Sequence, residues 1–121
     1  MTYPLLSVAL GGAIGAAARF LIGAALARPG FPIGVLSVNV AGSFLMGLLV
    51  VWLGQRGLTD WQPFLLTGLL GGFTTFSAFS LETVTLIERG EMAQAGLYVA
   101  LSVGLSVGAL AFGVWLARQL A

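Results

Sequence analysis

The side chains best suited to chemistry in this sequence lie in one stretch, Gly71 to Ser80, which reads GGFTTFSAFS. Phe73, Phe76 and Phe79 recur every three residues and alternate with hydroxyl side chains. An aromatic ring has a positive edge as well as a negative face, and a hydroxyl donates hydrogen bonds. Such groups along one path would suit a small, hard anion that must shed its water, although phenylalanines at helical spacing are more often packing residues.

The same stretch interrupts the segment in which it lies. It belongs to an apolar run from Phe64 to Ile87, which exceeds the roughly 20 residues needed to cross a bilayer. Glycine and β-branched residues are poor helix formers, so the pattern predicts that the backbone unwinds or kinks here. Non-helical backbone at membrane depth persists only where it is buried in protein or lines a polar cavity. Its exposed carbonyl oxygens would coordinate Na⁺ well.

Other polar residues in apolar runs can each be structural or functional. Asn39 either bridges two helices or donates its NH₂ group to a polar or anionic passenger. Arg19 either snorkels to the interface or supplies positive potential at the mouth of an anion path. Glu82 could pair with Arg19, cap a cavity or act as a proton-coupled carboxylate. A polar stripe in the last run, which would face protein or water, comprises Tyr98, Ser102 and Ser106.

The elements that must position these residues are membrane helices. Hydrophobic residues make up 59% of the chain and charged residues 7%, whereas a soluble domain has about 25% charged residues. We therefore predict an all-α, multi-pass membrane protein with one domain over residues 1–121. Its four expected spans are 4–27, 33–53, 64–87 and 92–116.

Composition also excludes several functions. Cysteine and histidine are absent, which removes disulfides, Cys or His metal sites and His-based triads, and we expect no enzyme. A net charge of +1 argues against a nucleic-acid partner. So short a chain encloses little interior by itself, so oligomerisation is expected. Small residues spaced four apart are read as helix-packing faces: Gly11 and Gly15, Ser43 and Gly47, Gly68 and Gly72, Gly104 and Gly108.

The basic residues do not favour either orientation in the membrane. Four spans place Arg56 and Arg118 on one side and Arg28 and Arg89 on the other. Orientation normally follows an excess of Lys and Arg in cytoplasmic loops, and here the count is two against two. Either another signal decides the orientation, or the chain inserts both ways and pairs antiparallel.

Three blocks of the sequence resemble the small dual-topology fluoride channels, the Fluc or CrcB family. The blocks are GGAIGAAARF at 11–20, NVAGSF at 39–44 and GLLGGFTTFSAFSLE at 68–82. The third block is the most specific, and with the four-span layout the resemblance covers nearly the whole chain. Departures from the family pattern are Phe20, Ala78 and Leu110, where the family usually carries hydroxyl side chains.

The resemblance implies an antiparallel homodimer in the bacterial inner membrane. Two pores, each lined by both subunits, would pass fluoride out of the cell by electrodiffusion and so reduce fluoride toxicity. By position, Arg19 matches a basic residue of the vestibule, and the carbonyls of Gly71 and Thr74 match those that hold one structural Na⁺ at the dimer interface. The residues expected along the fluoride pore are Asn39, Phe76, Ser77, Phe79, Glu82, Tyr98 and Ser106.

Two other functions remain as alternatives on sequence grounds. A proton-coupled small multidrug exporter also has four spans, but it would require a carboxylate in the first span, where this chain has none. The only carboxylate within a span is Glu82, near the end of the third. A non-conducting structural subunit, with every polar residue joining helices, fits poorly with a hydroxyl-rich helix break.

Overall fold

The computed structural model describes residues 3–120, which form helices and short connectors. Four helical stretches are long and apolar enough to cross a membrane, by their length and composition. The third of these stretches, Thr59–Glu88, is divided into four shorter elements. In chain order, the elements are α1 Pro4–Ala25, α2 Ile33–Gln55, η1 Thr59–Trp61, η2 Pro63–Leu70, α3 Gly71–Phe73, α4 Phe76–Glu88 and α5 Met92–Leu120.

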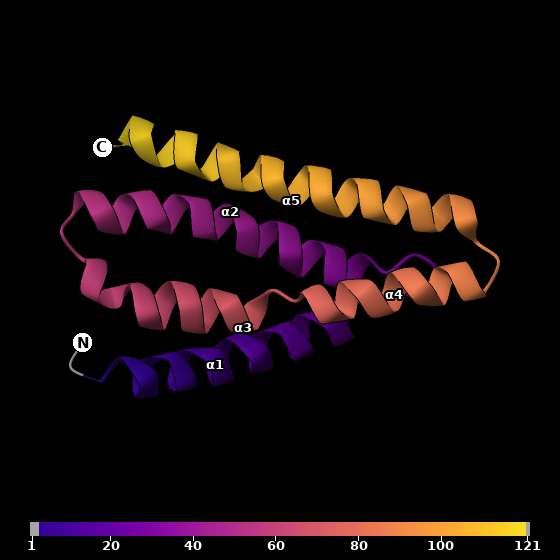
Figure 1. The fold of residues 1–121 in the computed structure, drawn as a ribbon, viewed down its shortest axis with the longest axis horizontal. Helices are drawn as coiled ribbons and strands as arrows, with labels where there is room; N and C mark the ends of the chain where they lie inside the picture. Colours follow the sequence, from indigo (N-terminus) through magenta and orange to yellow (C-terminus); the bar gives the residue numbers. More distant parts are fainter. Residues whose placement is uncertain (1–2, 121) are drawn as a thin grey trace.

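Successive stretches run in opposite directions along one long axis (Figure 1). α2 packs mainly on α5, α1 packs on η2 and α3, and α4 packs on α5. The α2–η1 connection and the end of α5 therefore lie at one end of the bundle, and the α1–α2 and α4–α5 connections lie at the other (Figure 1). This arrangement puts Arg56 and Arg118 at one end and Arg28 and Arg89 at the other.

Six of the buried side chains form two clusters, one on each side of the break in the third stretch. The first contains Leu53, Leu66 and Leu70. The second contains Leu86, Ala95 and Tyr98, and Phe79 packs against it. The middle of the bundle, between the clusters, is where the polar residues of the chain meet.

The break lies at two threonines. Thr74 (φ −90°, ψ 158°) and Thr75 (φ −152°, ψ 123°) are extended, whereas Gly71 is helical (φ −62°, ψ −38°). The interruption therefore falls inside the expected stretch, at its β-branched residues and not at its glycines. Thr74 Oγ1 donates to Leu70 O at 3.0 Å and closes the last turn before the break. Thr75 Oγ1 accepts from the Ala78 N–H at 3.1 Å and caps α4, a role for which threonine is well suited.

Glycines let α1 approach the third stretch backbone to backbone. A Cβ at Gly15 would overlap the carbonyl oxygen of Leu69, and one at Gly72 would lie 2.6 Å from Gly12 O. Gly11 and Gly68 meet in the same way, as the small-residue spacing predicted, while Gly104 and Gly108 have nothing within 4 Å. Close backbone approach without side chains is how small residues join helices in lipid.

We expect Gly15→Ala to lower the stability of the purified protein by about 1–3 kcal/mol, because the new methyl group forces α1 away from Leu69. The matched control is Gly96→Ala, since a Cβ at Gly96 meets nothing within 4 Å. It should leave stability unchanged or raise it by up to about 1 kcal/mol through better helix propensity. Thermal unfolding in detergent distinguishes the two variants, and equal midpoints would contradict the close contact.

Candidate functional site

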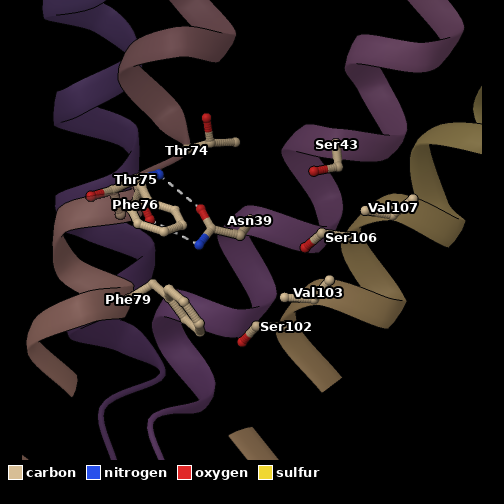
Figure 2. Close-up of a pocket in the computed structure, with 10 residues that line it drawn as sticks. All are labelled: Asn39, Ser43, Thr74, Thr75, Phe76, Phe79, Ser102, Val103, Ser106 and Val107. Atoms are coloured by element: carbon tan, nitrogen blue, oxygen red, sulfur yellow. Dashed lines mark hydrogen bonds between the residues drawn. The ribbon is translucent and has the colours of Figure 1, made fainter. Parts of the chain in front are cut away.

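A cavity of about 280 Å³ lies at the helix break, between α2, α4 and α5 (Figure 2). Its polar lining comes from α2, α5 and the break itself, and its aromatic lining comes from the first turn of α4. Ten residues line it: Asn39, Ser43, Thr74, Thr75, Phe76, Phe79, Ser102, Val103, Ser106 and Val107. None of them is ionisable at neutral pH, so the cavity offers donors, acceptors and aromatic rings without a formal charge.

Asn39 holds the break by pairing with the backbone of Thr75. Its Nδ2 donates to Thr75 O at 3.0 Å, and its Oδ1 accepts from the Thr75 N–H at 2.8 Å (Figure 2). The two bonds together fix which way the amide points. Asn39 thus bridges two helices, which was one of its two expected roles. An amide NH₂ has two donors, and only one is used in this pairing, so the second is available to the cavity.

The break also leaves two nearby backbone carbonyls without their helical hydrogen-bond donors. In a continuous helix the Thr75 N–H would donate to Gly71 O, and the Ala78 N–H would donate to Thr74 O. Here the first donates to Asn39 and the second to the Thr75 hydroxyl. The carbonyl oxygens of Gly71 and Thr74 therefore lack their helical donors. Of these two residues, Gly71 lies on the exposed surface of the chain.

Four aromatic rings extend from the cavity into the bundle. Phe76 and Phe79 have centroids 5.5 Å apart, and Phe79 and Tyr98 have centroids 5.3 Å apart. Phe31, from the α1–α2 connector, meets the Tyr98 ring edge-on at 5.5 Å and 88°. Tyr98 is fully buried at 0% exposure, whereas Phe76 is 78% exposed. Phe79 therefore packs against a buried ring, whereas Phe76 projects from the surface of the single chain.

Several hydroxyls near the cavity differ in whether they have a hydrogen-bond partner. Those of Thr74, Ser80 and Thr83 donate to carbonyls of their own helices, so they are locally satisfied. Tyr98 Oη and Ser102 Oγ are different, because both are buried and neither makes a well-formed hydrogen bond within residues 3–120. A buried hydroxyl without a partner is costly. Ser102 lines the cavity, so a solute or water there can accept from its hydroxyl.

Besides Gly71 and Tyr98, three expected site residues do not line this cavity. Ser77 is exposed, and its Oγ lies 3.3 Å from Thr75 Oγ1. Arg19 lines a neighbouring cavity of about 240 Å³, where its Nε donates to Gly72 O at 3.1 Å. Its guanidinium is thus turned towards the break. Glu82 lines a third cavity, of about 250 Å³, together with Arg28 and Arg89.

Sequence reasoning did not single out several of the lining residues. Ser43 follows Asn39 by one helical turn and was read only as a packing residue. Val103 and Val107 each follow a serine of the α5 stripe, so a wider view of that face would have found them. Thr75 was covered only by the general mention of hydroxyl side chains in the stretch Gly71 to Ser80. Its role as cap and as partner of Asn39 depends on a contact between residues 36 positions apart.

These features define a helical membrane protein whose interrupted helix borders a small polar and aromatic cavity, a construction used for ion pathways. Comparison with known proteins agrees with that class. The sequence matches the family described as CrcB-like protein, Camphor Resistance (CrcB), over residues 6–114, and the chain belongs to this family.

Curated relatives with the name Fluoride-specific ion channel FluC match over nearly the full length. The protein of Roseobacter denitrificans is 62% identical over 119 residues, covering 94% of each chain. That of Ruegeria sp. is 60% identical over 122 residues, covering 98% of this chain and 97% of the relative. That of Caulobacter vibrioides is 50% identical over 121 residues, covering 95% of each.

We expect Asn39→Asp to lower the free energy of unfolding by about 2 kcal/mol, because a carboxylate cannot donate to Thr75 O and leaves that carbonyl without its partner. Ser43→Ala is the matched control: Ser43 lines the same cavity from the same helix. Chemical or thermal unfolding in detergent measures both. Equal stability of Asn39→Asp and the unaltered protein would contradict the pairing with Thr75.

Proposed function

We propose that this chain is a fluoride-specific ion channel of the bacterial inner membrane, which lets fluoride leave the cell by passive electrodiffusion. The observation that carries the proposal is the uncharged cavity at the helix break, in a chain 62% identical to a relative of that name. Export by this route would lower the fluoride concentration in the cytoplasm.

The cavity offers what a small anion needs when it loses water. Fluoride entering it would accept hydrogen bonds from the free N–H of Asn39 and from the hydroxyls of Ser102 and Ser106. The positive ring edges of Phe76 and Phe79 would replace further water contacts. These donors are neutral, so they compensate for dehydration without binding the anion too tightly to leave.

The absence of an ionisable group from the cavity lining supports passive conduction. A proton-coupled exporter needs a carboxylate that substrate and proton share, and Glu82 lines a different cavity with Arg28 and Arg89. In the proposed channel, Glu82 lies near one mouth of the path. Tyr98, buried behind Phe79, would set the position of the Phe79 ring.

A second copy of the chain would complete the site. Phe76 is 78% exposed, and Gly71 and Ser77 are also on the surface at the break. A hydroxyl and a carbonyl without its helical donor would be costly if they faced lipid, so this face needs protein cover. Because the arginines are two at each end of the bundle, an antiparallel partner is compatible with insertion in both directions. Such a homodimer would hold two pores, with Phe76 reaching the partner.

The carbonyls at the break fit a structural Na⁺. Gly71 O and Thr74 O have lost their helical donors, and hard carbonyl oxygens are suitable ligands for this ion. Two carbonyls are too few for a cation site, so we place the ion at the dimer interface, where the partner contributes the same pair. Bound there, Na⁺ would neutralise the negative ends of these carbonyls and hold the two breaks together.

Arg19 would attract anions through the electrostatic potential of its positive charge. It is half-buried, and its Nε is fixed on Gly72 O, next to the proposed cation ligand. A guanidinium held there, in a cavity that shares Thr75 with the fluoride cavity, raises the local potential for anions. This is the vestibule role that the sequence suggested.

Proteoliposomes loaded with potassium fluoride should release fluoride rapidly when valinomycin carries potassium out, and should release little chloride under the same conditions. A fluoride electrode follows the efflux. Release no faster than from protein-free liposomes would overturn the proposed function.

The same assay tests the cavity itself. Asn39→Asp should reduce fluoride release by at least about tenfold, because a carboxylate repels the anion and removes the NH₂ donors. Ser77→Ala should change it less, since Ser77 does not line the cavity of the single chain. Equal release from Asn39→Asp and the unaltered protein would remove Asn39 from the path.

Insertion in both directions is tested by cysteine labelling, which the cysteine-free sequence makes simple. Thr59→Cys and Met92→Cys place one exposed thiol at each end of the bundle without changing any charge. In sealed vesicles, a membrane-impermeant maleimide should label about half of each variant, because balanced arginines favour neither orientation. Complete labelling of one variant and none of the other would contradict the antiparallel dimer.

A further inference from the structure

α2 and α5 both terminate at the same end of the bundle (Figure 1). A fourth cavity, an apolar groove, lies between them there. Its volume is about 300 Å³, and it shares no residue with the fluoride cavity. Leu48, Leu49 and Trp52 of α2 line one side, and Ala117 and Leu120 of α5 line the other. The proposed conduction path does not use it.

Two arginines lie next to residues that line this groove. The Arg56 guanidinium lies over the Trp52 ring, 5.4 Å from its centroid, and Trp52 lines the groove. Arg118 directly follows the lining residue Ala117 and is exposed. Within the part of the chain that the structure describes, neither arginine forms an ion pair. The helix ends beside the groove therefore carry two positive charges that have no ion-pair partner among residues 3–120.

The position of the groove along the helices indicates that it faces lipid. α2 ends at Gln55 and α5 at Leu120, so Trp52, Arg56 and Arg118 lie within one or two turns of the helix ends. Tryptophan and arginine at such positions sit at the level of lipid headgroups. An apolar groove that begins there and continues towards the membrane interior is open to acyl chains. Guanidinium groups bind phosphate through paired N–H donors.

We propose that this groove binds one anionic phospholipid. An acyl chain lies against Leu48, Leu49 and Leu120, and the phosphate and anionic headgroup meet Arg56 and Arg118. The charge of the two arginines selects anionic over zwitterionic lipids, and the groove selects a lipid over a free phosphate ester. This site is independent of fluoride conduction, because it lies away from the helix break.

The test is native mass spectrometry of the delipidated, full-length protein with dioleoyl-phosphatidylglycerol or dioleoyl-phosphatidylcholine added. The phosphatidylglycerol should be retained preferentially. The double variant Arg56→Gln, Arg118→Gln should weaken that retention by more than about tenfold, since each arginine near the headgroups contributes about fivefold. Retention of the phosphatidylcholine should not change.

Two controls separate the site from general charge effects. Arg28→Gln with Arg89→Gln removes the same number of arginines from the opposite end of the bundle and should leave phosphatidylglycerol retention unchanged. Dihexanoyl-phosphatidylglycerol, which has the same headgroup but short chains, should bind more weakly than the dioleoyl lipid. Thermal unfolding confirms that each exposed-arginine variant is folded.

Three outcomes would overturn the proposal. Equal retention of the two dioleoyl lipids would remove the preference for anionic headgroups. An equal loss from both pairs of arginine variants would show charge attraction without a site. Loss of dimers, with unchanged lipid retention, in the Arg56→Gln, Arg118→Gln variant would assign this face to a second copy of the chain.

Discussion

The amide pairing between Asn39 and Thr75 is the interaction on which the site depends. An extended residue in a membrane helix leaves an N–H and a C=O without helical partners, and lipid offers none. The Asn39 side chain supplies both, with bonds of 3.0 and 2.8 Å. It therefore replaces the backbone partners of Thr75 and lets the chain stay extended at membrane depth.

Three further hydrogen bonds stabilise the break. Thr75 caps α4 with its hydroxyl, and Thr74 closes the preceding turn with its own. The Arg19 guanidinium binds Gly72 O from the side of α1. The break is thus held by α2 on one side and α1 on the other. Side chains from both neighbouring helices therefore supply the contacts that fix the geometry of the break.

The sequence predicted that the third span would fail as a continuous helix, but helix propensity did not separate the glycines from the threonines of this stretch. Of the two residues matched to the break, Thr74 is extended, together with Thr75, whereas Gly71 is helical. Propensity is a local quantity, whereas the break is decided by Asn39, 36 residues earlier in the chain. The same limit explains why Asn39 could be read as bridge or donor: only the fold shows that one N–H bridges and another is left over.

The break also explains why so small a chain would need a partner. Holding Thr75 with Asn39 removes the donor of Gly71 O, and capping α4 with Thr75 removes the donor of Thr74 O. The bonds that stabilise the break inside the bundle therefore create acceptors that they do not satisfy. Phe76, the first residue after the break, is 78% exposed at the same place. A cation bound between the carbonyls would satisfy these acceptors, and a second copy of the chain would cover Phe76 at the same interface. The proposed Na⁺, the proposed dimer and the proposed pore would thus all depend on one pair of hydrogen bonds.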